Sequence, residues 1–325
     1  MKKLINLSYH PSVMAWFDDD FRNVEKFLVK NDLDGVEILV SPEMDMERVP
    51  RELVGGVHLH YDPSWVDCYT NHEQNLLTQC GSLENIRAFF GEGGLARSKA
   101  RYEQEISLCE KWGADYAVFH VSDVGLDEVF LEKPFRRTDE EVMAYAAKWI
   151  NSIFGEETSF LLAFENLWWP GLTFRDYGET KCFFAQVLPR KKGFVLDIGH
   201  IMANIGGLKT EKEAAAAICA RLDGLKELRD EIKVMHLNSA LSADYLSRSH
   251  RKEYEDFMGE TDIWQRLGKA RSSVLNIDLH VPFTDPSIKD VLKKAQVDHL
   301  VMEFLAPSLA QFETYIKMQK EVLDI

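Results

Sequence analysis

Acidic residues and histidines stand at the ends of short apolar runs along this chain. In the stretch 193–200, an apolar run ends in Asp197 and, three residues later, in His200. Glu165 ends a second apolar run, and Glu303 ends a third. Because the carboxyl ends of parallel strands meet on one face of an α/β protein, we expect these side chains to share one site. Gly199 is expected to let the chain turn sharply where the strand stops.

The ten histidines of the chain follow the same placement. Seven of them lie at or next to the end of an expected strand or extended segment, namely His10, His58, His60, His120, His200, His236 and His280. A single histidine in such a place is more often a packing residue. Acids and imidazoles that face one cavity, however, repel or stay unpaired unless a cation binds them. Oxygen and nitrogen donors without a thiolate favour Zn²⁺, Mn²⁺ or Fe²⁺.

Strands and helices alternate about eight times along the sequence. The expected strands are 4–10, 36–40, 57–61, 116–120, 160–166, 193–200, 232–238 and 299–304. The expected helices are 21–30, 82–90, 96–112, 139–154 (with Thr138 as N-cap), 174–187, 210–231, 285–296 and 307–323. This order predicts a parallel sheet with helical crossovers. Eight units predict a closed (β/α)8 TIM barrel that spans residues 1–325 as a single domain. An open doubly wound sheet is the alternative, but no Gly-x-Gly-x-x-Gly follows the first strand.

Two long connections interrupt the alternation, and we interpret them as insertions after the third and seventh strands. Residues 62–95 contain a short helix, and residues 239–273 are polar and charged with some helix. Residues 274–280 are expected to re-enter as an extended segment that ends in Asp278-x-His280. Loops of this length are either lids and binding loops or surface excursions, and both interpretations stay open.

The motifs at the strand ends resemble those of the xylose isomerase-like barrel superfamily. That superfamily includes sugar-phosphate isomerases and epimerases, and also the endonuclease IV-like branch (AP endonuclease family 2). The resemblance covers nearly the whole chain and is carried by Glu165-Asn166, Asp197-x-x-His200, His236-Leu237-Asn238 and Glu303. In the epimerase branch it implies one divalent metal, zinc or manganese, held by Glu165, Asp197, His236 and Glu303, with His200 helping to hold substrate.

The resemblance to the epimerase branch implies a metal-dependent enzyme of carbohydrate metabolism that acts on a small sugar or sugar-like substrate. The metal would polarise a carbonyl group, and Glu165 and Glu303 would remove and return a proton through an enediolate. Expected substrate contacts are His10, His60, Asn166, Trp168 and Trp169, with at most one of the two tryptophans lining the pocket.

The endonuclease IV-like branch implies a different reaction, the zinc-dependent hydrolysis of a phosphodiester in abasic DNA. That branch binds three zinc ions, and the additional ligands here would be His58, His120, His200, Asp278 and His280. The chain departs from its pattern, because Ser239 follows Asn238 where an acid is usual, and Asp278 lies some forty residues after His236. Its DNA-binding basic loops have no counterpart except the short run 248–252. A third possibility is a non-catalytic barrel that binds metal and a sugar-like ligand.

Composition limits the class of partner and the compartment. The net charge of −15 argues weakly against a sequence-independent grip on nucleic acid. No apolar run could span a bilayer, and the first residues lack the apolar segment of a signal peptide. The five cysteines have no paired spacing, so we expect reduced thiols in a cytoplasmic protein. A homo-oligomer is compatible with the sequence.

Overall fold

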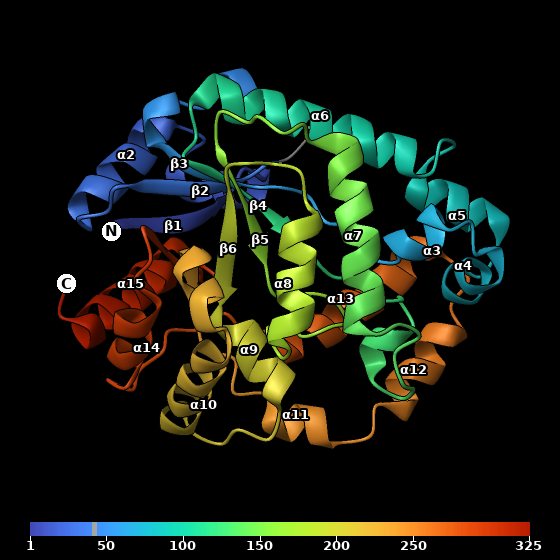
Figure 1. The fold of residues 1–325 in the computed structure, drawn as a ribbon. Coiled ribbons are helices and arrows are strands. Elements are labelled where there is room, and N and C mark those ends of the chain that lie inside the picture. The colour runs from blue at the N-terminus through green and yellow to red at the C-terminus, as the bar shows by residue number, and fades with distance from the viewer. Residues whose placement is uncertain (41–43) are drawn as a thin grey trace.

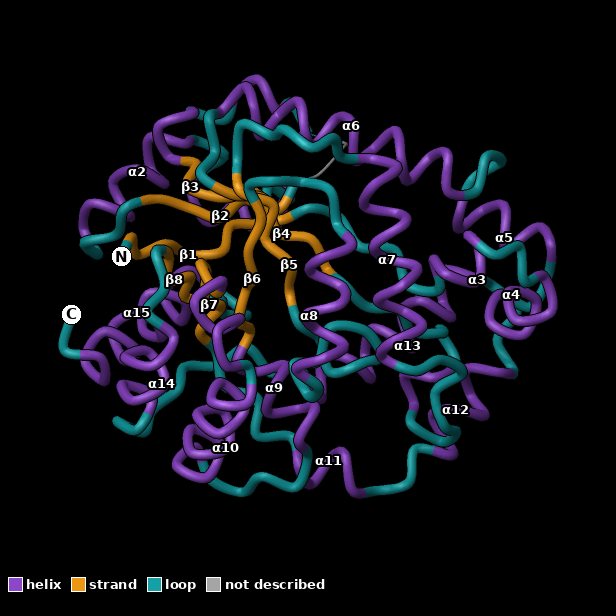
Figure 2. The backbone as a smooth tube through the Cα atoms, viewed as in Figure 1, coloured by secondary structure: helices purple, strands orange, loops and turns teal. Residues whose placement is uncertain are grey.

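Eight strands close into one parallel barrel in the computed structural model, which describes residues 1–40 and 44–325. The strands are β1 (Lys2–Ser8), β2 (Gly35–Leu39), β3 (Val54–His58), β4 (Tyr116–His120), β5 (Leu161–Glu165), β6 (Lys192–Asp197), β7 (Ile232–Leu237) and β8 (His299–Met302). Each strand pairs in parallel with the next, and β8 returns to β1 with Val301 opposite Leu4. Figures 1 and 2 show the strands at the centre and the helices outside them. The predicted (β/α)8 barrel is therefore confirmed.

Helices cover the outside of the barrel. The first half of the chain contains α1 (Pro11–Met14), η1 (Ala15–Phe17), α2 (Phe21–Lys30), η2 (Met46–Arg48), η3 (Arg51–Leu53), α3 (Trp65–Tyr69), α4 (Glu73–Cys80), α5 (Leu83–Phe90), α6 (Leu95–Trp112), η4 (Glu128–Phe130) and α7 (Asp139–Ile153). The second half contains α8 (Tyr177–Gln186), α9 (Ile198–Ile205), α10 (Glu211–Gly224), η5 (Lys226–Glu231), α11 (Ala243–Ser247), α12 (Arg251–Met258), α13 (Ile263–Ile277), α14 (Ile288–Ala295) and α15 (Leu309–Leu323). None of the helices in the described part of the chain is long and apolar enough to cross a membrane.

The interior of the barrel is filled by small and β-branched side chains. The buried cluster there consists of Leu4, Tyr116, Val118, Ala163, Val195, Val234 and Val301. Tyr116 is the largest of these residues, and a Cβ atom on Gly56 would lie 2.3 Å from its ring. Gly56 thus makes room for the phenol, which crosses the interior and donates a hydrogen bond to Glu37 Oε2 at 2.6 Å.

The prediction of an extended segment over 274–280 is wrong for the first residues of that range. Residues 274–277 form the last turn of α13, and Asp278 is the C-cap of that helix, with its N–H donating to the carbonyl of Val274. The apolar face of α13 is interrupted by Arg266 and Ser273, which are both buried. A helix is recognised in a sequence from apolar residues at helical spacing. Because two buried positions of α13 are polar, this spacing is interrupted and the helix was not predicted.

The insertion after β3 is more regular than expected. Residues 62–95 form three helices, α3, α4 and α5, where one short helix was expected. Figure 1 shows these helices together with α12, on the side of the molecule opposite the two termini. A second hydrophobic core lies beneath them, and α13 contributes Ile263, Ala270 and Ile277 to it. The insertions therefore pack as structured elements against the barrel mouth.

Most of the other expected helices are found, with small changes at their ends. Residues 21–30 form α2 as expected, and Thr138 caps α7 in a capping box with Glu141. The long helix expected over 210–231 ends at Gly224 and is followed by η5. The first strand ends at Ser8, so His10 is the N-cap of α1 rather than a strand residue.

Candidate metal centre

A cavity of about 560 Å³ opens at the carboxyl ends of the strands. Its lining includes the acids and imidazoles Glu37, His58, His120, Glu165, His200, Asp278, His280 and Glu303. Asp197 and His236 lie just beneath this surface and are completely buried. The structure therefore brings together all the residues that the sequence predicted as metal ligands, including the Asp278-x-His280 pair from the end of α13.

These side chains form four groups that could each hold a divalent cation. Within each group, one ligand atom per residue lies within 4.8 Å of the others. The groups are His58 with His120 and Glu165, Glu165 with Asp197 and His236, His200 with Asp278 and His280, and Glu37 with His58 and His236. Glu165 is common to the first two groups. Glu303 adjoins the second group, with Oε2 3.2 Å from His236 Nδ1.

The backbone fixes which nitrogen of three histidines faces the cavity. Nδ1 donates to the carbonyl of Leu59 in His58 (3.1 Å), of Asn166 in His200 (2.8 Å) and of Glu303 in His280 (3.2 Å). We assign these donors because a carbonyl oxygen can only accept. The Nε2 atoms then point at carboxylates, with His280 Nε2 2.6 Å from Asp278 Oδ2. Histidines that bind metals are usually oriented through the other ring nitrogen in this way.

His236 has the opposite orientation, and a residue that the sequence did not single out explains it. Its Nε2 atom lies 3.1 Å from Glu37 Oε2, whereas Nδ1 lies 3.3 Å from Glu165 Oε1. Glu37 is 1% exposed and also accepts the hydrogen bond of Tyr116. It stands within β2 rather than at its end, so strand-end reasoning missed it. The detectable signal was a carboxylate between the apolar residues Val36 and Ile38.

Several buried polar atoms at the centre lack a hydrogen-bond partner among the described residues. They include one carboxylate oxygen each of Glu165, Glu303 and Asp278. His120 Nε2 lies 2.9 Å from the free oxygen of Glu165, but the geometry of a hydrogen bond is not met. A cation site requires carboxylate oxygens and imidazole nitrogens that converge while some of them stay free of hydrogen bonds. The residues present therefore fit a divalent metal.

The acids of the centre are stabilised in their charged form by the neighbouring imidazoles. Burial opposes the ionisation of Glu165, yet His120 and His236 hold its pKa well below the usual range. Glu303 is also buried, and His236 and His280 lower its pKa to about 2. Burial lowers the pKa of His58 as well, but the hydrogen bond and charge of Glu165 outweigh this and raise it to about 9. Without metal, protons on His58, His200, His236 and His280 therefore balance the carboxylates, whereas burial lowers the pKa of His120.

Asp197 behaves differently, because burial raises its pKa to about 7. Its Oδ1 atom caps α9 by accepting from the N–H of His200 at 2.7 Å, and Oδ2 accepts from Asn238 Nδ2 at 3.0 Å. Gly199 does not act as the expected sharp turn, since it is the second residue of α9. A Cβ atom there would lie 1.8 Å from Asn238 Oδ1, so Gly199 makes room for the amide that holds Asp197.

The expected substrate contacts separate into those that reach the cavity and those that do not. His10 lines the mouth of the cavity. His60 is buried against Glu105, with Nδ1 2.8 Å from its Oε2. The Asn166 amide bonds to both backbone groups of Asp197, each at 2.9 Å. Trp168 and Trp169 pack behind the lining, and the ring of Trp168 lies 4.9 Å from that of His200.

Comparisons with known proteins identify a fold. No family model matches the sequence, and no curated relative is detected. Endonuclease IV from Thermus thermophilus is similar in structure, with a TM-score of 0.55, 13% identity, and coverage of 100% of this chain and 99% of that chain. The chain has the xylose isomerase-like barrel fold. An L-ribulose 3-epimerase is similar with a TM-score of 0.50 and 15% identity, over 98% of this chain and 94% of that one.

The xylose isomerase-like barrel is thus shared here with an endonuclease and with a sugar epimerase. The protein of the AsfvAP:AG structure has a TM-score of 0.52 and 12% identity, over 99% of this chain and 98% of that chain. Identities this low show the fold and leave the reaction open. Enzymes of two reaction classes therefore use this barrel, and the chemistry of this chain has to be argued from its own residues.

Proposed function

We propose that this chain is a divalent-metal-dependent hydrolase of phosphate esters, with a centre that holds more than one ion. The sequence alone favoured a single-metal isomerase. The observation that carries the change is the presence of four ligand groups, two of which share Glu165, rather than one. A single ion at Glu165, Asp197, His236 and Glu303 would leave the His58–His120 pair and the His200–Asp278–His280 group without a metal-binding role. Several cations within one site are typical of phosphoryl chemistry.

The residues that would hold the ions are the first three groups described above, with Glu303 completing the second. Bound divalent cations would supply Lewis-acid stabilisation of the charge that develops on the phosphate oxygens. The carboxylate oxygens of Glu165, Glu303 and Asp278 that lack donors would serve as ligands. Asn238 and Asn166 would keep Asp197 in place through their hydrogen bonds to it.

One positively charged side chain at the cavity also supports an anionic substrate. Arg271 on α13 is the single Lys or Arg among the residues that line the cavity. Its guanidinium has no ion-pair partner among the residues that the structure describes. An Arg at the mouth of a metal site is suited to bind a phosphate oxygen, because its donors match phosphate geometry.

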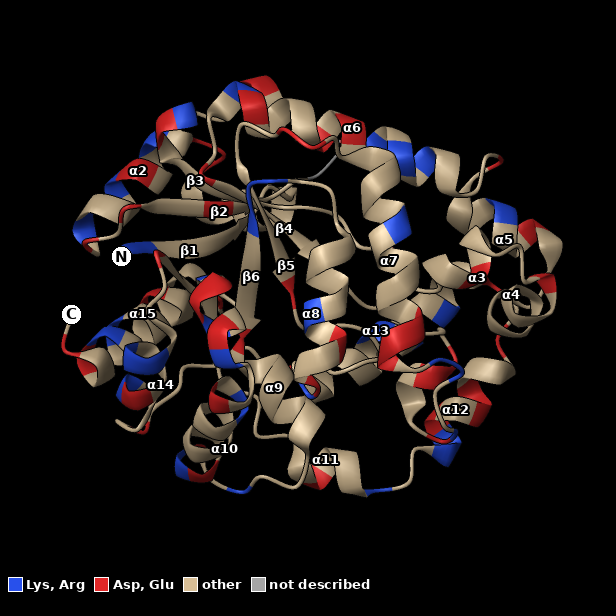
Figure 3. Cartoon of the chain, in the orientation of Figure 1, with Lys and Arg blue, Asp and Glu red and all other residues tan. Residues whose placement is uncertain are grey.

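The charge distribution favours a small phosphate ester over duplex DNA. Basic and acidic segments alternate along α6, α10, α12, α14 and α15 in the view of Figure 3. In the basic run 248–252, Arg248 pairs with Glu253 and Arg251 with Glu255. Binding of duplex DNA through its phosphate backbone requires clustered, unpaired Lys and Arg. We therefore propose a low-molecular-weight phosphodiester or phosphomonoester as substrate.

A metal-dependent isomerase or epimerase is the second candidate function. It is favoured by Glu165 and Glu303, whose carboxylates approach the same His236 Nδ1 atom at 3.3 Å and 3.2 Å. Each also has one buried oxygen without a donor, as a proton acceptor requires. In this reading one ion would be bound, and the remaining histidines would contact the hydroxyl groups of a sugar.

Metal content and turnover together test the proposal. Protein purified without chelator would be analysed for bound elements and assayed with bis(4-nitrophenyl) phosphate, 4-nitrophenyl phosphate and a panel of ketoses. We expect two or three equivalents of zinc or manganese, hydrolysis of a phosphate ester, and no ketose conversion. An Asp278→Asn variant should lose about one equivalent and most of the hydrolysis, whereas Asp290→Asn on exposed α14 should match the wild type. One equivalent with ketose conversion would support the isomerase and reject the hydrolase.

A further inference from the structure

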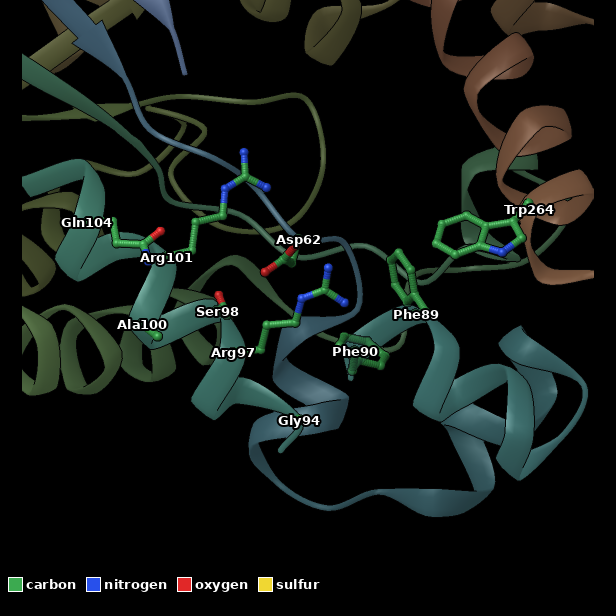
Figure 4. A pocket seen from close by; sticks show the side chains of 10 residues that line it. All are labelled: Asp62, Phe89, Phe90, Gly94, Arg97, Ser98, Ala100, Arg101, Gln104 and Trp264. Atoms are coloured by element: carbon green, nitrogen blue, oxygen red, sulfur yellow. The ribbon is translucent and has the colours of Figure 1, made fainter. Parts of the chain in front are cut away.

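A second cavity lies beside the barrel mouth, outside the metal centre. We call it the distal pocket, and it has a volume of about 400 Å³. Its walls come from α5, α6 and the start of α13, and its main side chains are Asp62, Phe89, Phe90, Arg97, Arg101 and Trp264. Figure 4 shows Phe89 and Trp264 next to each other, with Arg97 and Arg101 on the other side and Asp62 between the two arginines. This volume suits one nucleotide-sized group.

The aromatic wall of the distal pocket is open to solvent. Trp264 is 60% exposed, although tryptophan is usually well buried. Phe89 is partly buried beside it, on α5. Exposed aromatic faces that line a cavity provide a stacking surface for a flat ring, because stacking depends on the π-face and tolerates different ring types.

The opposite wall is positively charged. Arg97 has no ion-pair partner among the described residues, and Arg101 bonds to Glu105 while still lining the pocket. Both arginines lie on the first two turns of α6, which has Gly94 as its N-cap, without a side-chain cap or an acidic residue in its first turn. The partial positive charge of that helix end adds to the two guanidinium groups. This wall is suited to a phosphate group.

Helix α13 contributes a residue to each of the two cavities. Trp264 lines the distal pocket and Arg271 lines the metal cavity, seven residues further along the same helix. Positions i and i+7 lie on one face of a helix, about 10 Å apart. The end of β3 and the loop after it do the same, since His58 lines the metal cavity and Asp62, four residues later, lines the distal pocket. The distal pocket is therefore a neighbour of the metal cavity, within reach of one elongated molecule.

We propose that the distal pocket binds the non-reacting end of the substrate, and that this end is nucleotide-like. A flat heteroaromatic ring stacks on Trp264 and Phe89, a phosphate pairs with Arg97 and Arg101, and the carboxylate of Asp62 accepts a hydrogen bond from a sugar hydroxyl. The proposal rests on the proposed function, because it assigns the substrate of the metal centre to small phosphodiesters that carry a nucleotide. Arg271, which would contact the scissile phosphate, lies about 10 Å further along α13 than Trp264.

Binding to chelator-treated full-length protein tests this assignment without requiring catalysis. Calorimetric titrations would use the four common nucleoside 5′-monophosphates, the matching nucleosides, ribose 5-phosphate and inorganic phosphate. We expect at least one monophosphate to bind more tightly than both its nucleoside and ribose 5-phosphate. Trp264→Ala should weaken that monophosphate about fivefold or more, as expected for loss of a stacking partner, and leave ribose 5-phosphate unchanged. Arg97→Gln should weaken both phosphates and leave the nucleoside unchanged.

Matched controls lie on two of the helices that line the distal pocket, at positions outside it. Leu275→Ala replaces an exposed apolar residue of α13, and Arg87→Gln replaces an exposed arginine of α5 that does not line the pocket. Both should bind the monophosphates as the wild type does. Equal affinity of the wild type for monophosphate and ribose 5-phosphate would overturn the proposal, as would unchanged monophosphate affinity in Trp264→Ala.

The outcome for the distal pocket can be separated from that for the metal centre. Monophosphate binding that depends on Trp264, in a protein that hydrolyses no phosphate ester, would retain the pocket and reject the hydrolase. Hydrolysis of bis(4-nitrophenyl) phosphate by a protein that binds no monophosphate would retain the hydrolase and reject the pocket. Tighter binding of a single-stranded oligonucleotide than of any monophosphate, weakening steeply with salt, would reject a small ligand.

Discussion

Glu37 lies at the floor of the cavity, between Tyr116 and His236. By accepting from His236 Nε2, it turns Nδ1 towards Glu165 and Glu303. Tyr116 holds the same Glu37 oxygen from the other side at 2.6 Å. Glu37 is thus a positioning residue: it fixes the orientation of a ligand and would also increase the basicity of the imidazole.

Replacing Glu37 by Gln should weaken metal binding at the group formed by Glu165, Asp197 and His236. The amide is similar in shape but no longer carries the charge that His236 faces, and the loss of such a partner typically lowers metal affinity by roughly 10- to 100-fold. Competition with a chelator measures this affinity. Glu52→Gln, on the exposed η3, is the control. Tyr116→Phe removes the second bond to Glu37 and should cause a smaller loss. Unchanged affinity in both variants would reject the positioning role.

Gly199 gives a second prediction at the scale of one residue. Gly199→Ala should lower the free energy of unfolding by about 1–3 kcal/mol, because the new Cβ atom would lie 1.8 Å from Asn238 Oδ1. Gly268→Ala, in α13 with no atom within 4 Å, should instead be neutral or stabilising. Urea unfolding of both variants gives the comparison. If Asn238→Ala does not relieve the Gly199→Ala defect, the clash is not its cause.

At the scale of elements, a buried polar network joins the insertion after β3 to the loop after β4. Arg137 bonds to Asp67 of α3 and lies 3.2 Å from Asp123 in the loop. Gln79 of α4 donates to the same Asp67 at 2.7 Å. One guanidinium therefore serves two buried carboxylates, so the network carries a net negative charge. Burial accordingly raises the pKa of Asp123 to about 7, although Arg137 lowers it.

This network predicts a pH-dependent effect of Asp123→Asn. A folded-state pKa above the unfolded value means that protonated Asp123 stabilises the fold at low pH, and that this stability is lost as pH rises through about 7. The neutral amide avoids the loss, so the stability of Asp123→Asn relative to the wild type should increase from pH 5 to pH 8. Between pH 5 and pH 8 the upper limit is about 3 kcal/mol, because the wild type loses stability over about two pH units, from pH 5 to about 7. Urea unfolding at several pH values measures the difference, and Asp290→Asn should show none. A difference of the opposite sign would mean that Arg137 dominates.

The strands, and the gathering of most candidate ligands at the barrel mouth, could be predicted because their signals are local. Each strand is a short apolar run, and the residue at its carboxyl end meets the others only because the barrel closes. Glu37 was not predicted as part of the site because it lies inside a strand. Helix α13 was not predicted because Arg266 and Ser273 are buried polar residues. Arg266 bonds to the carbonyls of Gln79 and Glu260, each at 2.7 Å, which no sequence period reveals.

The direction in which each side chain points at the barrel mouth could not be predicted from the sequence. His58 and His60 are two residues apart near the end of β3, yet His58 faces Glu165 and His60 faces Glu105. Asn166 directly follows Glu165 but is directed at the backbone of Asp197. These directions depend on tertiary partners from other strands and helices. Spacing alone therefore predicted which residues gather at the mouth, but not which of them reach the cavity.

At the scale of the whole molecule, metal loading should stabilise the fold. The ligands come from positions between His58 and Glu303, so an ion that binds only the folded chain shifts the unfolding equilibrium. A free metal concentration of about 100 times Kd would add about 2.7 kcal/mol. Thermal unfolding with and without chelator, followed by re-addition of zinc or manganese, measures the effect. Asp278→Asn should reduce the gain and Asp290→Asn should not. Identical melting temperatures with and without chelator would contradict ion binding by the folded state.

Helix α13 has a further consequence for the molecule as a whole. It carries Trp264 at its beginning, Arg271 in its middle and Asp278 at its C-cap, where Asp278 joins His200 and His280. A displacement of this helix as one body would move the ring of Trp264 and the carboxylate of Asp278 together. Any effect of a molecule at Trp264 on cation affinity would then be reciprocal, because the cation must change the affinity for that molecule by the same factor.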